Sequence, residues 1–577
     1  MSAQPTTVRI GNAQAFWGDR GDAAAELLAQ VPDLDYLTMD YLAEVSLSIL
    51  AVQRERDPSV GYARDFVDVV ASLAPYWAGG GRCKLIVNAG GLNPHGCAEA
   101  CKRALESGGC RAMKIAVVSG DSVLESLKAP TDDAQRNHFQ NLDTRAPIST
   151  VADRLVTANA YVGSTPIVEA LRTGAEIVIT GRVADPSLVV AACWHHFHWS
   201  ETDWNRLAGA TVAGHLVECG TQVTGGISTD WLDVPDPAHI GFPIVEVSDD
   251  GSCVVTKPPG TGGTVSEATV KEQLVYEIGD PAAYLSPDVK VSFLSLTVKQ
   301  VGPDRVHVSG AAGSLRPQTL KVSATYRDGY RAAGTLTVIG ADSAAKARRC
   351  GEIVLQRLKE AGQPLRESLV ECLESPTATL LRIAVEAEAK ASVERFSKEL
   401  MPLITAGPPG TTGYAEGRPR VHPVFRYWPC LIHRDSVTSR VDVLETSATT
   451  AGKQTWSPST KSAPQRFSPS STPVSSASRT LKDLAYGRSG DKGIGANLGI
   501  IARRPEEFSF LKEWLTADRV QEFFAADGAD AVVRYEIPNL SAMNFVLRGV
   551  LRRSLQTDAQ GKALAQRLLQ MPLPDVQ

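Results

Sequence analysis

The chain has 577 residues, of which 43% are hydrophobic and 21% charged, and its 59 Lys and Arg against 64 Asp and Glu give a formal net charge of −5. These proportions are those of a globular protein with two or three domains, and they exclude an intrinsically disordered chain. Without a cationic excess to neutralise a phosphate backbone, nucleic acid is excluded as an expected partner.

The first residues lack the basic and apolar regions of a secretory signal, and no stretch approaches the roughly 18 apolar residues of a membrane span. We therefore expect a soluble, cytoplasmic protein with no membrane partner. Ten scattered cysteines without a CxxC motif fit reduced thiols better than a disulfide framework.

Short apolar segments alternate with segments of helical period at the start of the chain, which is the pattern of βα units. This pattern predicts an α/β fold with a mostly parallel sheet. The predicted strands are Val8–Ile10, Tyr36–Met39, Leu85–Val87, Ile115–Val118 and Ile177–Ile179, and the predicted helices are Ala23–Gln30, Leu42–Arg54, Tyr62–Trp77, Ala98–Glu106 and Pro166–Arg172.

Each of these strands is followed by a loop rich in Gly, Asn, Asp or Arg. The loops read GNAQAFWGDRGD, DYLAE, NAGGLNPHG, SGDS and TGRVADPS in chain order. In open parallel sheets, ligands bind outside the carboxyl ends of the strands, where loops and helix N-termini converge. The sequence therefore predicts a small-molecule site at this edge.

The residue composition changes twice in the remainder of the chain. Alternating Val, Thr and Ser beyond residue 240 predict a β-rich subdomain, inserted or appended, followed by helices at Ser343–Ala361 and Ala384–Phe396. A segment crowded with Ser, Thr and Pro then predicts a flexible linker before a small α+β domain. The predicted divisions are 5–240 (α/β domain with the site), 241–440 (β-rich subdomain and helices), 446–480 (linker) and 481–577 (C-terminal domain).

The first two loops offer carboxylates for proton transfer. Asp19 is a candidate base, with Arg20 beside it to bind a carboxylate or phosphate, although Asp also caps helices. Asp40 and Glu44 lie one helical turn apart, a spacing that can share a proton but also occurs on solvated helix faces.

The loop after the third strand, Asn88–Pro94, suits a ligand oxygen. Gly90 and Gly91 let backbone N–H groups approach a ligand, and Asn88 and Asn93 present amide donors, although a purely structural turn explains the loop equally well. The spacing is not GxGxxG, so no dinucleotide site is predicted.

Two further candidates come from ANAYVGSTP, where Asn159 would bind substrate and Tyr161 would protonate or hydrogen-bond a carbonyl. Arg182 and Asp185 lie at the exit of a very apolar strand. Charges at such a position either pair with each other or meet a ligand.

His215 and Glu218 are three residues apart and so share a helix face. They form an acid–base couple, a hydrogen-bonded structural pair, or part of a metal site that would need a third ligand such as Asp185 or Asp230.

Two Gly-rich segments complete the candidates. Lys257 precedes GTGG, whose Gly262 and Gly263 could help bind an anion, but the Walker A spacing is missing and ATP hydrolysis is not predicted. In the last domain, polar residues gather around two strands, and tight hairpin chemistry is the alternative explanation there. The candidate binding residues of this domain are Asp491, Lys492, Asn497 and Asn539.

Long motifs carry a resemblance to the acyclic terpene utilisation AtuA-like family. They include IGNAQAFWGD, LDYLTMDYLAEVSLSIL, ITGRVADPSL, GHLVECGTQVTGG and TKPPGTGGTVSEATVKEQLVYEIGDP. The last unit resembles the small AtuA-like domain through LAYGRSGDKGIGANLGIIAR and RYEIPNLSAMNFVL. Members of this family usually read SGDKGDTAN where this chain has Ile494 in place of the acid and Gly495 in place of the hydroxyl residue.

The resemblance implies a role in the catabolism of branched or acyclic terpenoid acids, beside acyl-CoA carboxylases, dehydrogenases and hydratases. We expect an enzyme that acts on an acyl-CoA thioester as a hydratase, lyase or hydrolase. No flavin, nicotinamide or biotin motif is present, so coenzyme A is expected as part of the substrate and no cofactor is firmly implied.

Two other functions remain open from the sequence. One is a non-catalytic assembly protein that binds an acyl-CoA or an acyl-CoA carboxylase through a mobile C-terminal domain. The other is a metal-dependent hydrolase centred on His215 and Glu218. A homo-oligomer is compatible with each of these functions.

Overall fold

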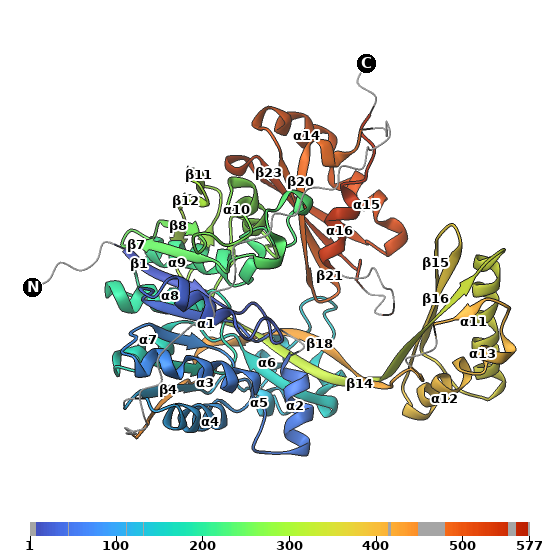
Figure 1. The fold of residues 1–577 in the computed structure, drawn as a ribbon, viewed down its shortest axis with the longest axis horizontal. Coiled ribbons are helices and arrows are strands. Elements are labelled where there is room, and N and C mark those ends of the chain that lie inside the picture. The colour runs from blue at the N-terminus through green and yellow to red at the C-terminus, as the bar shows by residue number, and fades with distance from the viewer. Residues whose placement is uncertain are drawn as a thin grey trace, which may run out of the picture.

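The computed structural model describes residues 7–43, 46–110, 112–130, 132–413, 417–447, 479–551, 555 and 561–574, and of Lys492 it describes the backbone alone. The chain forms a body built on a large sheet, an arm (residues 329–424) that projects from the body, and a C-terminal domain (Figure 1). Almost all of the predicted linker lies outside the described residues, as does Glu44.

The large sheet of the body is mixed, so the prediction of a mostly parallel sheet is wrong. Its ten strands, counted over the described residues, follow the order β11-β12-β8-β7-β1-β2-β3-β6-β4-β19. The parallel strands in the middle are the five predicted from the sequence. They are β1 (Thr7–Asn12), β2 (Tyr36–Met39), β3 (Lys84–Val87), β4 (Lys114–Ser119) and β6 (Ile177–Thr180).

Antiparallel strands extend this sheet on both sides, because segments predicted as a separate β-rich subdomain pair directly with its edges. They are β7 (Ile244–Ser248), β8 (Cys253–Thr256), β11 (Thr297–Gly302), β12 (Arg305–Ser309) and β19 (Arg440–Glu445). A small three-stranded sheet lies nearby and comprises β9 (Tyr284–Leu285), β10 (Lys290–Ser292) and β13 (Ala312–Ser314).

Helices cover both faces of the large sheet, and each face has its own apolar core. Alternate residues of one strand supply the two cores, as Ile86 and Val87 of β3 do. Helices α1 (Ala23–Gln30), α3 (Asp65–Ala78) and α4 (Pro94–Ser107) cover one face, and α7 (Thr165–Arg172), α8 (Ser187–Phe197) and α9 (Trp204–Val217) cover the other. The remaining helices of the body are α2 (Ser46–Arg56), α5 (Leu124–Lys128), α6 (Asp133–His138) and α10 (Glu267–Leu274).

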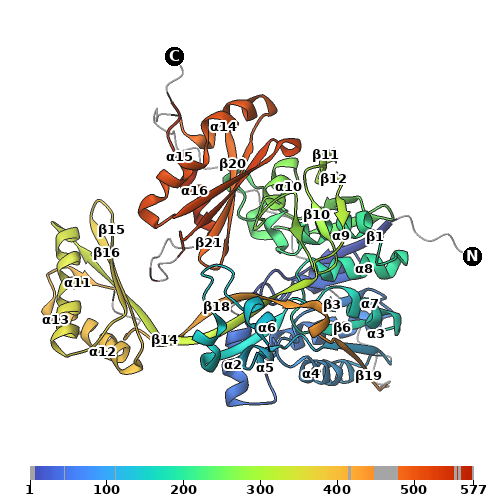
Figure 2. The same cartoon turned by 180° about the vertical axis from the view of Figure 1, so that it is seen from behind.

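The longest strand, β14 (Thr319–Ile339), runs from the body into the arm (Figures 1 and 2). Within the body it pairs with β18 (His422–His433) and β5 (Leu155–Ala160). The sequence did not predict β5, because its Ala and Asn residues have low strand propensity and its partner lies far away in the chain.

The arm has its own apolar core between a sheet and helices. The predicted helix Ala384–Phe396 is wrong at its start, because Ala384 and the next three residues belong to β16, where pairing with β14 and β15 overrides their helix propensity. The elements of the arm are α11 (Ser343–Glu360), β15 (Glu367–Glu374), β16 (Ala378–Ala387), α12 (Lys390–Leu400), α13 (Leu403–Ala406) and β17 (Thr411–Thr412).

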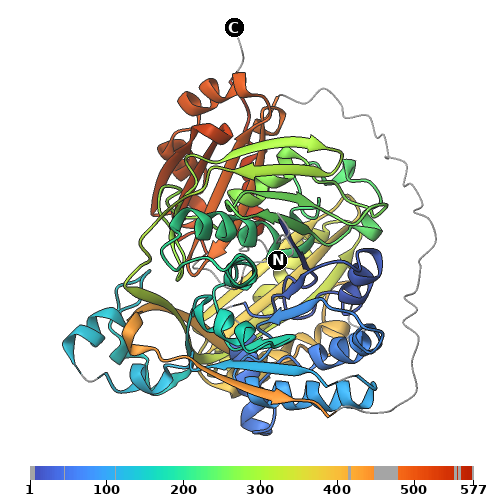
Figure 3. The same ribbon diagram turned by 90° about the vertical axis from the view of Figure 1, so that its left-hand side faces the viewer.

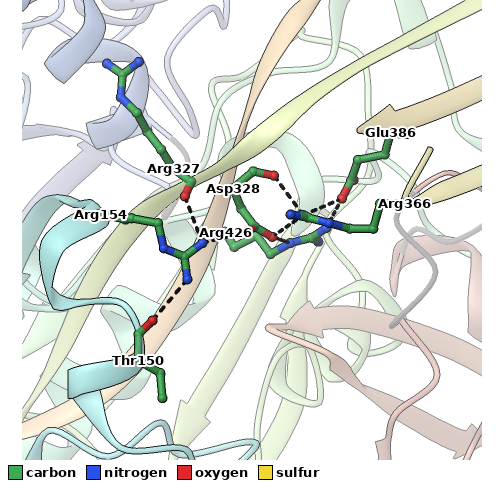
Figure 4. Close-up of polar contacts among 7 residues, drawn as sticks. All are labelled: Thr150, Arg154, Arg327, Asp328, Arg366, Glu386 and Arg426. Atoms are coloured by element: carbon green, nitrogen blue, oxygen red, sulfur yellow. Dashed lines mark hydrogen bonds and ion pairs between the residues drawn. The ribbon is translucent and has the colours of Figure 1, made fainter. Parts of the chain in front are cut away.

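A network of charges joins the arm to the body (Figure 4). Asp328, at an irregularity of β14, contacts Arg154 of the body at 2.9 Å, Arg366 at 2.8 Å, and Arg426. The fully buried Glu386 pairs with Arg366 and Arg426. Burial acts to raise the pKa of Asp328, but the three guanidinium groups hold it below its usual value.

The C-terminal domain is a four-stranded antiparallel sheet in the order β20-β21-β23-β22, with helices enclosing a core of its own. It packs against α10 and the neighbouring part of the body (Figure 3). Its elements are β20 (Ala485–Lys492), β21 (Gly495–Ala502), α14 (Phe508–Trp514), α15 (Ala517–Phe523), β22 (Ala531–Ile537), β23 (Ala542–Arg548) and α16 (Gly561–Leu568).

All ten cysteines are free thiols, as the sequence predicted, and eight of them are buried. Within the part of the chain that the structure describes, no helix has both the length and the apolar character needed to cross a bilayer.

Candidate functional site

The loops after β2 and β3 meet through a buried hydrogen bond between Asp40 and Asn88. The Asn88 side chain donates to Oδ1 of Asp40 at 2.7 Å and accepts from the backbone N–H of Tyr41 at 2.7 Å. The backbone N–H of Leu42 also donates to Oδ1 of Asp40, at 3.1 Å. Asn88 therefore holds the Asp40 carboxyl group in place at the carboxyl end of the sheet.

Arg182, which follows β6, brings a third strand-end loop to this point. Its guanidinium group contacts Oδ1 of Asp185 at 2.7 Å and donates to the carbonyl oxygen of Leu42 at 2.5 Å. The ring of Tyr161 lies 4.1 Å from the guanidinium carbon, in cation–π geometry. Of the two alternatives for Arg182 and Asp185, the structure shows the ion pair.

His215 and Glu218 lie at the C-terminal end of α9 and face each other. Nδ1 of His215 is 3.3 Å from Oε1 of Glu218, and Nε2 lies 3.0 Å from the carbonyl oxygen of Gln273. The Gln273 side chain donates back to the carbonyl oxygen of His215 at 3.1 Å. The bond to Nε2 holds the imidazole ring, and the second bond ties Gln273 to the backbone of the same residue.

The carboxyl groups of this cluster influence one another. Burial, reinforced by the charge of Asp185, raises the pKa of Asp40 well above its usual value. Burial also raises the pKa of Glu218 to about 7, against the opposing effect of His215 and with the charges of Asp185 and Glu277 adding to the rise. Burial and mutual repulsion thus make both carboxyl groups weaker acids than usual, and the pKa of Glu218 falls near neutral pH.

Asp121, in the SGDS loop after β4, extends the cluster toward Asn159. Its Oδ2 accepts from the Asn159 side chain at 2.7 Å and from the backbone N–H of Arg182 at 2.9 Å. Burial raises the pKa of Asp121. Predicted residues from the loops after β2, β3 and β6, from the end of β5 and from the end of α9 thus join one region: Asp40, Asn88, Asn159, Tyr161, Arg182, Asp185, His215 and Glu218.

The first loop lies at the margin of this region. The Asp19 carboxylate accepts from the backbone N–H groups of Ala15 at 3.1 Å and Arg20 at 2.8 Å. The Arg20 side chain turns away to pair with Asp22 and Glu26. Asp19 thus folds back on its own loop, and the first helix begins after Asp22 without a side-chain cap.

The glycines after β3 are packed so closely that a side chain on either would collide with neighbouring protein atoms. A Cβ atom on Gly90 would lie 2.6 Å from the carbonyl oxygen of Thr180, and one on Gly91, where φ is +52°, would lie 2.4 Å from Leu50. Asn93 caps α4 by accepting from the backbone N–H of Gly96. The structure therefore gives these three residues packing and capping contacts, and their predicted role in binding stays a prediction.

Lys257 and the GTGG loop lie apart from the cluster. Nζ of Lys257 contacts Asp304 at 3.1 Å and donates to the carbonyl oxygen of Thr261 at 2.8 Å. A Cβ atom on Gly262 would lie 2.0 Å from the backbone of Asp236, and one on Gly263 would lie 2.4 Å from that of Thr224. The glycines are required by close backbone packing, and binding by this loop also stays a prediction.

Asparagines of the C-terminal domain form hydrogen bonds with the backbone of the segment after α10. Oδ1 of Asn497 accepts from the backbone N–H of Glu277 at 2.9 Å, and its amide donates to the carbonyl oxygen of Val275 at 2.7 Å. Asn544 donates to the carbonyl oxygens of Ile278 and Gly279. Glu277 has a φ of +55°, a left-handed conformation that is unfavourable for a residue other than Gly.

The β20–β21 hairpin lies along the body close to the same segment. Gly490 packs against Glu277 and Tyr276, and Gly493 at the turn packs against Asp143. Asp491 is exposed and lies against Gly561. Predicted residue Asn539 donates to the carbonyl oxygens of Phe293 and Leu296 at 3.0 and 2.8 Å, which fixes the other end of this interface.

A buried arginine completes the interface. Arg488 of β20 donates to the carbonyl oxygen of Ile227 at 2.6 Å and to the side chain of Gln222, and it lies 5.2 Å from the centre of the Tyr276 ring. Apolar residues of the C-terminal domain, including Ile501 and Leu540, join the core of the body. This domain is therefore packed firmly against the body.

Sequence reasoning missed Asp121, Gln273 and Glu277. Asp121 had a usable signal, because SGDS follows the fourth strand as the other polar loops follow theirs. Gln273 and Glu277 are embedded in EQLVYEIGDP, which carries no recognisable site spacing.

The third metal ligand that the sequence suggested is engaged elsewhere. Asp230 forms a bidentate ion pair with Arg503, with both distances 2.7 Å. Across the described ranges, no three His, Cys, Asp or Glu side chains come together in a way that could hold a metal ion.

Comparison with known families gives two matches. A family model described as acyclic terpene utilisation family protein AtuA matches residues 8–443. A model described as AtuA ferredoxin-like domain matches residues 479–574. No curated protein matches the chain.

Proposed function

The chain belongs to the acyclic terpene utilisation family AtuA, with an AtuA ferredoxin-like domain at its C-terminal end, and from this membership we propose that it is an acid–base enzyme acting on an acyl-CoA thioester. The substrate class is a branched or acyclic terpenoid acyl group. The reaction is the addition of water to a carbon–carbon double bond beside the thioester, or the reverse elimination.

One observation carries this proposal: two carboxyl groups, Asp40 and Glu218, interact electrostatically, and burial raises the pKa of both, that of Glu218 to about 7. Glu218, backed by His215, accepts a proton from water, and the hydroxide adds to the β-carbon of the substrate. Asp40 donates its proton to the α-carbon. The reverse sequence eliminates water, so protons balance in both directions.

The hydrogen bonds around Asp40 suit a proton donor. Asn88 and Leu42 both donate to Oδ1, so the proton of the carboxylic acid is expected on Oδ2. Two different carboxyl environments in one cluster are the usual means by which a protein separates an acid from a base.

The firm packing of the C-terminal domain supports an enzyme over a mobile assembly protein. Its asparagines hold Glu277, whose charge contributes to the raised pKa of Glu218. A domain that tunes the proposed base is expected to be part of the catalytic unit.

The test is to incubate the full-length protein with CoA thioesters of branched α,β-unsaturated and β-hydroxy acids and to follow gain or loss of water by mass spectrometry. We expect turnover by the wild type and a loss of about 10²- to 10⁴-fold in Glu218→Gln and Asp40→Asn. The matched control is Asp236→Asn, because Asp236 and His239 form a similar pair three residues apart, at 3.0 Å, outside the cluster. If the wild type converts none of the thioesters, the proposal is overturned.

A further inference from the structure

A polar sheet face leads into the acid–base cluster. Side chains that alternate along a strand share one face, so Thr157, Asn159 and Tyr161 of the β5 region lie on one side. The paired residues of β14 lie on the same side, because Ser323 is opposite Asn159 and Thr325 is opposite Thr157. We refer to these five residues as the polar face; the other side of the sheet holds an apolar core.

Among the residues that the structure describes, two buried polar atoms of this face find no hydrogen-bond partner. They are Oδ1 of Asn159 and Oγ of Ser323, whose residues are 1% and 0% exposed. The Asn159 amide nitrogen already donates to Asp121, which fixes Oδ1 as the free acceptor. An unsatisfied buried polar atom costs roughly 1–3 kcal/mol, so a bound group that pairs with both atoms would gain affinity.

A groove of about 570 Å³ opens onto this face between α2, α5 and β5, and Asn159 and Thr157 are among its lining residues. Four of its charged lining residues are basic and two are acidic; they are Arg54, Lys128, Arg154 and Arg327, with Glu55 and Asp153. Its volume suits a small molecule, and its balance of charge favours an anionic one.

The other end of the face reaches the cluster. Tyr161 lies two residues beyond Asn159 on the same side and contacts Arg182, which pairs with Asp185. Nζ of Lys321 lies 5.0 Å from the centre of the Tyr161 ring. A ligand that extended from the basic groove past Asn159 would thus approach Asp40 and Glu218 by way of Tyr161 and Arg182.

We propose that the polar face binds a secondary amide of an extended anionic ligand, whose phosphate lies in the basic groove. A secondary amide has an N–H group for Oδ1 of Asn159 and a carbonyl oxygen for the hydroxyl of Ser323, so a single group satisfies both atoms. A phosphopantetheine arm has this combination of amide and phosphate. This inference builds on the proposed function by assigning the polar arm of the thioester to a place in the fold.

The test is calorimetric titration of the full-length protein with 4′-phosphopantetheine, pantetheine and inorganic phosphate. We expect 4′-phosphopantetheine to bind more tightly than either of the other probes. Ser323→Ala should weaken both pantetheine-containing probes about tenfold without lowering the melting temperature, because the hydroxyl has no partner to lose in the free protein. Lys128→Ala should weaken only the phosphorylated probe, by about threefold to tenfold.

Two controls match these variants. Ser397→Ala removes a buried hydroxyl of the arm that does have a partner, the carbonyl oxygen of Pro419, so it should lower the melting temperature and leave binding unchanged. Lys390→Ala removes an exposed lysine of the arm and should change neither quantity.

Three outcomes overturn the inference: no binding of 4′-phosphopantetheine, equal binding of inorganic phosphate, or an unchanged affinity in Ser323→Ala, which would mean that only water occupies the polar face. Weaker binding in Ser323→Ala without any thioester turnover would keep the subsite and reject the proposed reaction. Turnover of a thioester with unchanged binding in Ser323→Ala would keep the proposed reaction and reject the subsite.

Discussion

Nδ1 of His215 lies 3.3 Å from Oε1 of Glu218, within ion-pair distance. The Gln273 carbonyl oxygen can only accept, so Nε2 of the same ring carries a hydrogen. Nδ1 of a neutral ring is then an acceptor facing a carboxyl oxygen.

Glu218 should make folding stability fall as pH rises. Its ordinary pKa is 4.5 and its pKa in the folded protein is about 7, so between these values the folded chain keeps a proton that the unfolded chain has released. Its contribution to stability is lost through this window, at up to about 1.4 kcal/mol per pH unit. Glu218→Gln removes this contribution, so wild type and variant should differ most in slope between pH 4.5 and 7, measured by urea unfolding.

The control for this measurement is Glu99→Gln, which changes an exposed residue of α4. Its stability should follow the wild-type pH profile. Parallel profiles for the wild type and Glu218→Gln would contradict the raised pKa of Glu218.

Glu277→Gly should separate stability from function. Glycine adopts the left-handed conformation of residue 277 without the cost of about 1–2 kcal/mol that other residues bear, which stabilises the folded protein. Glycine also increases the entropy of the unfolded chain, which destabilises the folded protein. Because the two effects oppose each other, the free energy of unfolding should change by less than about 1 kcal/mol. Because the charge of Glu277 raises the pKa of Glu218, the acidic limb of the pH–rate profile should move to lower pH.

Asp342→Gly is the matched control, since Asp342 is also left-handed, with φ of +58°, and its exposed side chain makes no cap hydrogen bond. It should leave the pH–rate profile in place. An acidic limb that does not move in Glu277→Gly would argue against electrostatic contact between Glu277 and Glu218.

The arm should loosen when its buried carboxylate is removed. Glu386→Ala leaves Arg366 and Arg426 without their buried partner, and breaking such a pair costs roughly 3–5 kcal/mol. Calorimetry should show an earlier unfolding transition, with faster proteolysis within residues 329–424. Glu394→Ala, which breaks an exposed pair with Lys390, should cost less than about 0.5 kcal/mol. Similar melting curves for the two variants would show that the buried network adds nothing to stability.

Arg488→Met should weaken the packing of the C-terminal domain. Burial raises the pKa of Glu272 to about 7 and the charge of Arg488 opposes this rise, so loss of the guanidinium should raise the pKa of Glu272 further and cost roughly 3–5 kcal/mol. Adding Glu272→Gln should restore part of the stability, as urea unfolding of both variants would show.

Arg519→Met is the control for this substitution, because Arg519 is exposed, and its side chain stacks on Trp514 at 4.9 Å and donates to the Trp514 carbonyl oxygen at 2.9 Å, both within the C-terminal domain. It should leave the free energy of unfolding in urea nearly unchanged. An equal loss of stability to urea in both arginine variants would mean that Arg488 has no special part in the interface.

Much of the body was predictable, because each central strand is an apolar run bounded by polar turns. Tyr36–Met39 appears in the structure with the predicted bounds, as does the helix Ala23–Gln30. The membership of the sheet was not predictable. β7 and β19 join its edges through pairings between distant parts of the chain, which local periodicity does not record.

The candidate site also has parts that the sequence could predict and parts that it could not. The spacing of His215 and Glu218 on one helix was enough to predict their contact, whereas Gln273, which fixes the ring, comes from another helix. The polar face did leave a pattern in the sequence, because Lys321, Ser323 and Thr325 alternate with apolar residues as Thr157 and Asn159 do. That pattern resembles an ordinary solvated strand, and only the structure shows that it is buried.

One strand, β14, carries Ser323 within the body and continues into the arm as far as Ile339. At about 3.3 Å per residue, its 21 residues span roughly 70 Å without leaving a sheet. The charged network at Asp328 lies at the irregularity of β14, between the part of the strand that carries Ser323 and the part that belongs to the arm. A single continuous strand thus connects the arm covalently to the polar face.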